Sequence, residues 1–277
     1  KSHVKEIKIS RIGYEILVQG NKLYRSRNIL LCTGGHPSGR KLAKQLGHTI
    51  VKPVPSLFSL SLLNNSLKSC SGISLKARIK LIVNKSKFVE TGKLLLTHWG
   101  VSGPVILKLS AFSARCLSSN NYKAEIFINW LSKTDHEIRD ELNFFKANNL
   151  RKSLWKYKPF IDLPKRLWIA LLKERDFDSN YKWSNLSKSD QEILIQMLTN
   201  SKYYVKGRGP FGDEFVTAGG ICLQEINLKT MESKIHKGLY FAGEIINIDG
   251  ITGGFNFQHC WTTGWIAGMA CSLKSQP

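Results

Sequence analysis

Hydrophobic and polar residues alternate in the first part of the chain, in the runs VKEIKI, YEILVQ and KLYRSRNILLCT of residues 4–33. A period of two is typical of strands with one buried face, and Gly13 and Gly20 mark turns between the runs. The pattern therefore predicts a small meander that ends in a buried strand. A run with helical spacing, SGRKLAKQLGH, follows before Pro53 and Pro55 break regular structure.

Residues 56–201 divide into two parts. The runs SLFSLSLL, ISLKARIKLIV and KAEIFINWL predict strands, with a helix expected at 104–114. Further on, apolar residues recur at three- and four-residue steps in DHEIRDELNFFKANNLRKSLWKY, LPKRLWIALLKERD and SKSDQEILIQMLTN, which predicts helices. Ser187 is a candidate cap for the last of them, and Pro164 suits a first helical turn.

Three apolar strand candidates end in glycines: ILLCTGG at 29–35, VTAGG at 216–220 and GLYFAGE at 238–244. A glycine-rich turn at 249–256 follows the third and leads into a final helix, QHCWTTGWIAGMACSL. Missing side chains let a ligand approach the backbone, and free amides at a helix start attract negative charge. Because ligands usually bind at the carboxyl edge of an open α/β sheet, these ends predict an anion or cofactor cradle.

The composition limits the choice of partners. Forty-one Lys and Arg against 20 Asp and Glu give a formal net charge of +21, which draws a protein toward nucleic acid, anionic lipid or an anionic small molecule. The basic residues are spread along the chain without a block of five or six, so a generally basic surface is the simpler interpretation. We expect a small-molecule substrate and no nucleic-acid partner.

The cysteines and the apolar runs indicate the compartment. Six cysteines form no C-x-x-C pair and have no histidine beside them at metal-ligand spacing, so we expect reduced thiols and no metal. No run approaches the roughly 18 consecutive apolar residues of a membrane span, and the first residues lack a signal-peptide pattern. The sequence therefore predicts a cytoplasmic protein.

The run FVTAGGICLQEINLKTMESKIHKGLYFAGEIINIDGITGGFNFQHCWTTGWIAG resembles the C-terminal signature of the BaiN-like (YhiN-like) flavoproteins, FAD-dependent oxidoreductases related to glutathione-reductase-type folds. ILLCTGG, GHTIVKPVPSLFSL and GKLLLTHWGVSGPVILKLS occur in the order found in that family. The resemblance covers nearly the whole chain and is weakest at 132–202.

The resemblance implies an α/β (α+β) fold with a discontinuous Rossmann-like FAD-binding domain at residues 1–55 and 203–277. A domain inserted at 56–202 would consist of a β-barrel-like part, 56–131, and a small helical unit, 132–202. The implied cofactor is FAD, the implied electron donor is NAD(P)H, and the implied substrate is an unsaturated small molecule such as an enone.

The resemblance also assigns cofactor contacts to the glycine-rich strand ends and the last helix start. These residues are Thr33, Gly34, Gly35, Gly219, Gly220, Gly243, Glu244, Asn247, Gly253, Gly254, Phe255 and Asn256. Amides at that helix start would stabilise the negative charge of a reduced flavin. The family pattern usually has Asp at the position of Asn247, and the amide is expected to weaken a contact with the ribityl or phosphate region.

A second departure from the family lies at the beginning of the sequence. Related proteins start with a strand, a G-x-G-x-x-G turn and a helix, whereas this sequence opens on Lys1 and strand-like alternation. Either a missing N-terminal polypeptide segment completes the site, which we favour, or conventional FAD binding has been lost. The 277-residue chain alone is therefore expected to bind FAD poorly.

The motif THWGVSGP at 97–104 has two interpretations. Ser102 could cap a helix begun by Pro104. His98 could instead face the substrate and exchange a proton during reduction of a conjugated double bond, because histidine titrates near neutral pH. We take His98 as the candidate catalytic residue, with His259 as a second candidate.

Two functions stay open on the sequence alone. One is an FAD-dependent oxidoreductase that passes hydride from NAD(P)H to an unsaturated small molecule. The alternative is a non-catalytic or degenerate relative that holds an anionic partner such as RNA on its basic surface.

Overall fold

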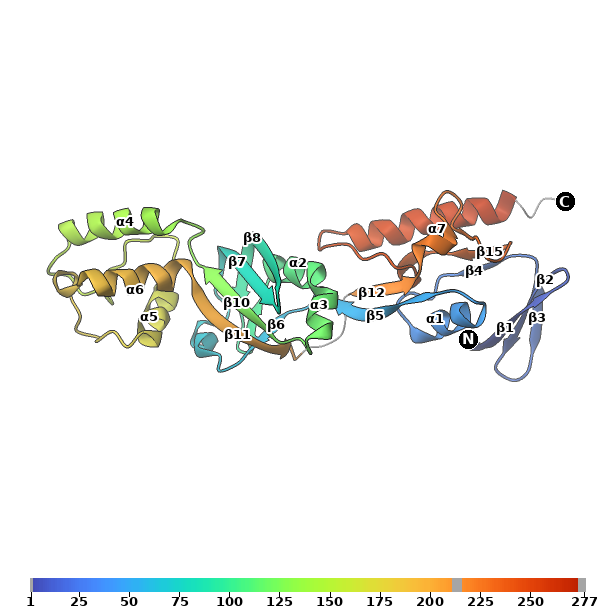
Figure 1. Cartoon of the computed structure of the whole chain (residues 1–277), viewed down its shortest axis with the longest axis horizontal. Helices are drawn as coiled ribbons and strands as arrows, with labels where there is room; N and C mark the ends of the chain where they lie inside the picture. Colours follow the sequence, from blue (N-terminus) through green and yellow to red (C-terminus); the bar gives the residue numbers. More distant parts are fainter. Residues whose placement is uncertain (1, 211–215, 274–277) are drawn as a thin grey trace. The chain divides into compact units, whose positions relative to one another are not determined.

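The computed structural model describes residues 2–210 and 216–273 of the 277-residue chain. The chain folds into two units, of which residues 1–56 and 214–277 form the first and residues 57–213 the second. The second unit is thus inserted into the sequence of the first, and each has a separate hydrophobic core. The predicted fold class, a mixed α/β chain with a barrel in its middle, is confirmed (Figure 1).

The first unit joins strands from both ends of the chain. The predicted meander is present as β1 (Val4–Ser10), β2 (Gly13–Val18) and β3 (Leu23–Ser26). A second sheet has the order β13 (Ile226–Asn227), β14 (Glu232–Ser233), β15 (Leu239–Phe241) and β4 (Ile29–Leu31). β15 and β4 are parallel, so the strand ends at ILLCTGG and GLYFAGE point the same way.

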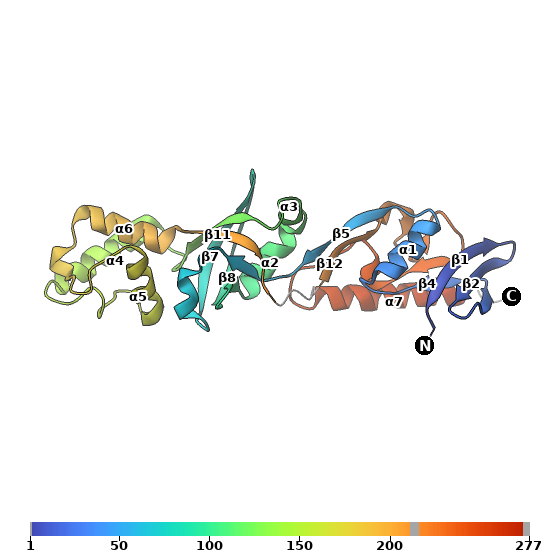
Figure 2. The ribbon, with the colours of Figure 1, turned by 90° about the horizontal axis from the view of Figure 1, so that it is seen from below.

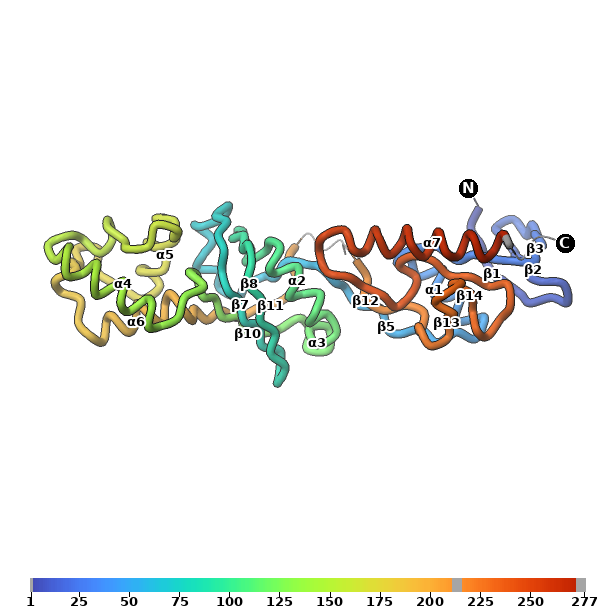
Figure 3. Tube along the Cα trace, turned by 90° about the horizontal axis from the view of Figure 1, so that it is seen from above, coloured from blue at the N-terminus to red at the C-terminus, as the bar shows by residue number. Residues whose placement is uncertain are grey.

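A two-stranded antiparallel sheet of β5 (Ile50–Ser56) and β12 (Val216–Ile221) completes the strands described in this unit. α7 (Phe255–Leu273) runs along β15, and α1 (Pro37–Gln45) packs near β5 and β12 (Figures 1 and 3). Two short 3-10 turns, η3 (Leu223–Glu225) and η4 (Gly243–Ile245), follow β12 and β15. The expectation that the three glycine-rich strand ends share the carboxyl edge of one open sheet is therefore wrong. β4 and β15 are parallel neighbours, but β12 pairs antiparallel with β5 in a separate sheet.

The second unit contains a closed six-stranded barrel in the order β10-β11-β6-β9-β8-β7. Figure 2 shows its strands β7, β8 and β11 with α2 beside them. The strands are β6 (Leu60–Leu62), β7 (Ser74–Val83), β8 (Ser86–Leu96), β9 (Gly100–Ser102), β10 (Ala124–Asn129) and β11 (Ser201–Arg208). Along β7 every second residue is buried, as a barrel wall requires. η1 (Ser66–Cys70), α2 (Pro104–Phe112) and α3 (Ala114–Ser119) pack against the strands.

The predicted helical part consists of α4 (Asp135–Asn148), α5 (Lys165–Glu174) and α6 (Lys188–Thr199), with the turn η2 (Trp183–Asn185) between the last two. Capping boxes start α4 at Thr134 and α6 at Ser187, so the cap predicted at Ser187 is confirmed. Trp168 and Trp183 are completely buried and donate their indole N–H groups to backbone carbonyls.

Two details differ from the expectation. Gly103, with φ of 93°, is the N-cap of α2, whereas Ser102 shares a hydrogen bond of 2.6 Å with Ser59 instead of capping the helix. β11 closes the barrel between β10 and β6, so residues 203–208 lie in the second unit and not in the C-terminal segment where the boundary was expected. The barrel is closed by a strand that follows the helical part in the sequence, and local sequence pattern does not predict such a long-range pairing.

Candidate cofactor site

The carboxylate of Glu244 joins the three glycine-rich segments of the first unit. Glu244 follows β15, its Oε2 accepts a hydrogen bond of 3.1 Å from the Gly35 amide, and its Oε1 accepts one of 2.6 Å from the Thr217 amide. Gly35 follows β4, and Thr217 lies in β12. The predicted residues Thr33, Gly34, Gly35, Gly243 and Glu244 are therefore brought together, although Glu244 is satisfied by the protein's own amides.

A glycine-rich loop leads from this region into α7. Asn256 closes the loop, because its side chain accepts a hydrogen bond from the Gly250 amide at 2.8 Å and donates one to the Gly250 carbonyl at 2.9 Å. Gly253 and Gly254 have φ values of 124° and 86°, which favour glycine. A methyl group on Gly254 would have open space around it, so this side of the loop is uncovered in the described structure.

The start of α7 carries unused donors. Among the described residues, the first hydrogen bond back into the loop is from the Gln258 amide to the Gly254 carbonyl, and none accepts from the amides of Phe255, Asn256 or Phe257. These amides form the partly positive end of a 19-residue helix. The predicted helix start thus has the donors that an anionic edge of a cofactor requires.

Side chains of α7 fix the helix to η4. The Thr263 hydroxyl accepts a hydrogen bond of 2.9 Å from the Gly243 amide, and the ring of His259 lies 3.2 Å from the Gly243 carbonyl, to which its Nε2–H can donate. Burial lowers the pKa of His259, with the Gly243 carbonyl acting in the opposite direction. His259 therefore has a structural role that explains its burial, and its part in proton transfer stays a prediction.

Three other predicted cofactor residues lie in or near β12. Gly219 and Gly220 lie inside β12 and are buried; a Cβ on Gly219 would stand 2.6 Å from the Lys52 carbonyl oxygen, and one on Gly220 would stand 2.3 Å from that of Ile245. The backbone N–H of Asn247 donates a hydrogen bond of 3.0 Å to the Ile221 carbonyl. The strand-end position predicted for the two glycines is thus wrong, and close backbone approach accounts for them.

An exposed apolar stripe runs along α7. Phe257, Trp261 and Trp265 are 70%, 67% and 74% exposed, and the first two rings stack with their centroids 6.2 Å apart. Their spacing of four residues places them on one helix face. Large apolar side chains are seldom left together in water, so this face is suited to contact with an apolar surface.

Sequence reasoning missed a buried polar network in the first unit. His48 is 2% exposed, its Nδ1 lies 3.1 Å from Glu225 Oε2, and its Nε2 lies 2.9 Å from the Ser233 hydroxyl. That hydroxyl also accepts hydrogen bonds from the amides of Ile235 and His236, so it is held as a turn-forming group and not presented as a nucleophile. His48 is remote in the sequence from Glu225 and Ser233, so no local pattern predicts that the three side chains are in contact.

This network predicts a pH dependence of stability. Burial lowers the pKa of His48 below its ordinary value of 6.5, although Glu225 acts in the opposite direction. Between the lowered pKa and 6.5 the unfolded chain binds a proton that the folded chain does not, so the free energy of unfolding falls as the pH drops below about 6.5. We expect the free energy of unfolding, measured by urea denaturation, to be lower at pH 5.5 than at pH 7. The loss should shrink in His48→Gln and persist in His3→Gln, which changes an exposed residue; an unchanged slope in His48→Gln would contradict the assignment.

The candidate catalytic residue lies in the second unit. His98 is exposed in the tight turn between β8 and β9, where Thr97 and Gly100 exchange backbone hydrogen bonds, and its ring packs edge-on against Trp99 at 4.3 Å. The turn geometry explains Thr97 and Gly100 without a ligand. The role of His98 in proton transfer stays a prediction.

In residues 2–210 and 216–273, no three His, Cys, Asp or Glu side chains are grouped in a way that could bind a metal ion. Within the same residues, no helix combines the length and the apolar composition that crossing a bilayer requires.

Fold and site together define a class: an α/β chain with an inserted barrel and helical part, in which a glycine-rich loop precedes the last helix of the discontinuous unit. Residues 54–216 match the family model described as HI0933-like protein barrel and H2TH domain. The chain belongs to this family, that of the BaiN-like flavoproteins.

Curated relatives are similar over most of this chain. The 3-dehydro-bile acid delta(4,6)-reductase of Clostridium scindens is 27% identical over 280 residues, which cover 98% of this chain and 68% of that protein. The ribosomal RNA dihydrouridine synthase of Haemophilus influenzae is 28% identical over 269 residues, 94% of this chain and 64% of that protein. The enzyme of the same name from Escherichia coli is 29% identical over 234 residues, 84% of this chain and 55% of that protein. The chain thus spans between about half and two thirds of the length of these relatives.

Proposed function

We propose that the chain forms part of an FAD-dependent reductase that adds two hydrogens across a carbon–carbon double bond conjugated to a carbonyl group. The names of the relatives support this chemistry, because a 3-oxo-Δ4,6 steroid and the uracil ring both contain such a bond. The observation that carries the proposal is the start of α7, whose first backbone amides have no acceptor among the described residues. The same helix is fixed by His259 and Thr263 to Gly243, the neighbour of the bridging residue Glu244.

The residues present fit a flavin. Gly254 leaves its side of the loop open, and the backbone amides of Phe255, Asn256 and Phe257 have no acceptor among the described residues. These amides would hold the pyrimidine edge of the ring and stabilise its negative charge, while Thr33, Gly34 and Gly35 would lie along the nucleotide. Bound FAD would supply hydride transfer, with NAD(P)H as the proposed source of the hydride. Glu244 would fix the spacing between β4, β12 and β15 that the cofactor requires.

The proposal includes a partner for this site. A polypeptide carrying a strand, a G-x-G-x-x-G turn and a helix would bind the pyrophosphate. The exposed face of α7 formed by Phe257, Trp261 and Trp265 is suited to pack against such a segment. FAD should therefore bind weakly to the 277-residue chain alone and more tightly when that segment is supplied.

We further propose a uracil base in RNA as the substrate, in place of the small molecule expected at first. Two of the three relatives described above carry an RNA-directed name, and the net charge of +21 favours a polyanion over a bile acid. During reduction a hydride would be added to one carbon of the double bond and a proton to the other. His98 is the proposed proton donor, because its imidazole is exposed in the turn between β8 and β9.

The test is a two-stage reaction with FAD and a synthetic glycine-rich segment added to the purified chain. NADH or NADPH should bleach the flavin absorbance under anaerobic conditions, and uridine-containing RNA should restore it while gaining two hydrogens per modified base by mass spectrometry. An enone that restores the absorbance when RNA does not would contradict the choice of substrate. RNA binding without any flavin reduction would instead support the non-catalytic alternative.

A further inference from the structure

The positive charge of the second unit is concentrated in its barrel. The described barrel segments, residues 57–131 and 201–210, contain 13 Lys and Arg but two Glu, whereas the helical part at 132–200 contains 13 Lys and Arg with 10 Asp and Glu. The helical part therefore neutralises most of its own charge, with pairs such as Arg139 and Glu192 at 2.7 Å. The barrel does not, so its surface carries a strong positive potential.

Strand register places the basic residues on one outward face, here called the basic face: Lys76, Arg78, Lys80, Lys87, Lys93 and Lys202. Lys76 lies opposite Lys93, and Lys80 lies between Val89 and Phe127, with Lys202 on the far side of Phe127. Like charges directly opposite each other on neighbouring strands destabilise a sheet. An anion bound across these strands would relieve that repulsion.

Carboxylates are nearly absent from this face. Glu125, which lies opposite Tyr204 in the register, is the outward carboxylate described on β7, β8, β10 and β11, and it pairs with Lys202 at 2.6 Å. Glu90 lies on the other face of β8, where it pairs with Lys108 at 2.9 Å. Among the described residues, no carboxylate pairs with the other five cations of the basic face.

Two aromatic rings are set among these cations. The ammonium groups of Lys80 and Lys202 lie 4.2 and 5.5 Å from the centre of the Phe127 ring, and Lys202 also lies 4.8 Å from that of Tyr204. Tyr204 is 51% exposed, which leaves ring surface available. Rings interleaved with cations are what single-stranded nucleic acid requires, because bases stack on the rings while the cations hold the phosphates.

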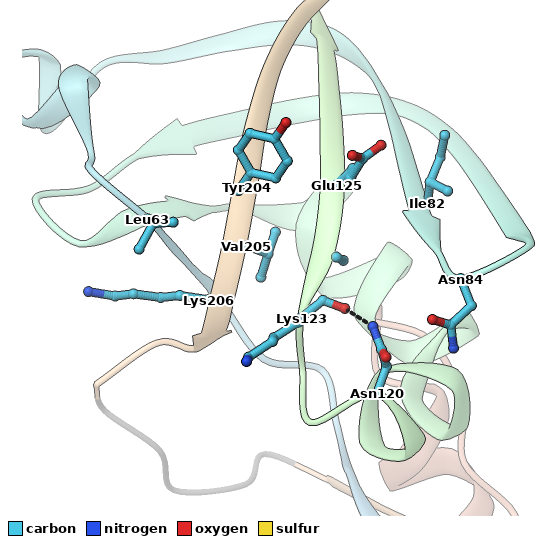
Figure 4. Close-up of a pocket in the computed structure, with 10 residues that line it drawn as sticks. Leu63, Ile82, Asn84, Asn120, Lys123, Glu125, Tyr204, Val205 and Lys206 are labelled. Carbon is cyan, nitrogen blue, oxygen red and sulfur yellow. Dashed lines mark hydrogen bonds between the residues drawn. The ribbon is translucent and has the colours of Figure 1, made fainter.

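A hollow of about 670 Å³ lies at the Tyr204 end of the basic face. Leu63, Ile82, Ala124 and Val205 give it an apolar lining, and its polar lining consists of Lys123, Lys206, Asn84, Asn120 and Glu125, the carboxylate paired with Lys202 (Figure 4). A smaller hollow of about 230 Å³ is lined by Phe127 and Asn129. Another, of about 300 Å³, lies between Asn129, the start of α4 and the end of α6. The hollows and the cations follow the same strands.

We propose that the basic face of the barrel is an RNA-docking surface that holds an unpaired segment, with its phosphates along β7 and β8 and a base against Tyr204. The choice of RNA over other polyanions rests on the proposed function, whereas the surface itself rests on the charge and the rings. The docking surface would bind the RNA substrate and take no part in the redox step.

The test measures binding of a fluorescein-labelled oligouridine of about 20 nucleotides to the full chain by anisotropy at several salt concentrations. The triple variant Lys76→Glu, Arg78→Glu, Lys80→Glu should bind about 100-fold more weakly near 0.1 M salt, with a salt slope shallower by about 2, because about three phosphate contacts are lost. The control Lys156→Glu, Lys182→Glu, Lys188→Glu makes the same charge change on exposed residues of the helical part and should bind within about threefold of the unchanged chain.

A second pair of variants separates stacking from charge. Tyr204→Ala should weaken binding about tenfold without changing the salt slope, because one stacking contact is lost. Tyr157→Ala removes another exposed tyrosine that lies near a lysine, Lys152 at 5.1 Å, and should have no effect. Should the triple variant fail to fold, Arg78→Gln with Lys80→Gln gives the same comparison with smaller losses.

The proposal is overturned if the two triple variants weaken binding equally, if Tyr204→Ala has no effect, or if the basic face binds phosphatidylglycerol vesicles and not RNA. Its failure can be told apart from failure of the proposed function. RNA binding through the basic face without flavin-dependent reduction would support the docking surface and contradict the proposed reductase. Reduction of an enone without RNA binding would support the reductase and contradict the docking surface.

Discussion

A Gly220→Ala variant is expected to lose about 3–5 kcal/mol of unfolding free energy without any cofactor present. The new methyl group would stand 2.3 Å from the Ile245 carbonyl oxygen, and the φ of 139° is unfavourable for a residue with a side chain. Overpacking against backbone costs about 1–3 kcal/mol, and backbone strain adds a comparable amount. The end of β12 approaches η4 closely at this point, where Ile221 bridges to Ile246.

Gly254→Ala is the matched variant, because it also replaces a predicted site glycine with positive φ but meets no atom within 4 Å. It should cost about 1 kcal/mol of stability and weaken FAD binding about tenfold, since the methyl group lies on the open side of the loop. Urea denaturation gives the free energy of unfolding, and fluorescence titration with FAD in the presence of the synthetic glycine-rich segment gives the affinity for FAD. If Gly220→Ala is as stable as Gly254→Ala, the packing explanation of the buried glycine fails.

Glu244→Ala should produce the second large effect, because it leaves the amides of Gly35 and Thr217 without their acceptor. Hydrogen bonds to a charged group contribute about 1.5–3 kcal/mol each, and Glu244 is only half-buried, so we expect a loss of about 2–4 kcal/mol. FAD binding should weaken as well, since the segments after β4 and β15 are no longer tied to β12.

The controls for Glu244 test whether the carboxylate acts as a bridge. Glu244→Gln keeps one acceptor oxygen and should lose about half as much stability. Glu6→Ala removes a carboxylate paired with Lys8 near the surface at 3.4 Å and should change stability by less than about 0.5 kcal/mol. A Glu244→Ala chain that unfolds at the same urea concentration as the unchanged chain would exclude the bridging role.

Local pattern predicted most elements because their signals are short-range. The run SKSDQEILIQMLTN became α6 with the capping box at Ser187, and ISLKARIKLIV became β7 with alternate burial. The misplaced features have long-range causes. Gly219 and Gly220 have the composition of a ligand loop, but they are glycines because the backbones of β5 and η4 leave no room for a Cβ. Both of these elements are remote from β12 in the sequence.

The distribution of charge also depends on long-range contacts that the sequence does not show. Along the chain the basic residues are spread evenly, which favoured a generally basic surface. Strand pairing then brings Lys80 and Lys202 to opposite sides of Phe127, although they are separated by the whole helical part. A one-dimensional count cannot find this face, because the neighbours belong to strands joined only when the barrel closes.

The sequence by itself predicted most of the strands and helices, the interrupted first unit and the family, because periodicity, caps and motifs act over a few residues or are matched in order. Only the tertiary structure decided that Glu244 bridges Gly35 and Thr217, that His48 is buried between Glu225 and Ser233, and that the barrel gathers its cations on one face. Each of these depends on contacts between residues remote in the chain, and the energy of such contacts is fixed by distance and burial in space.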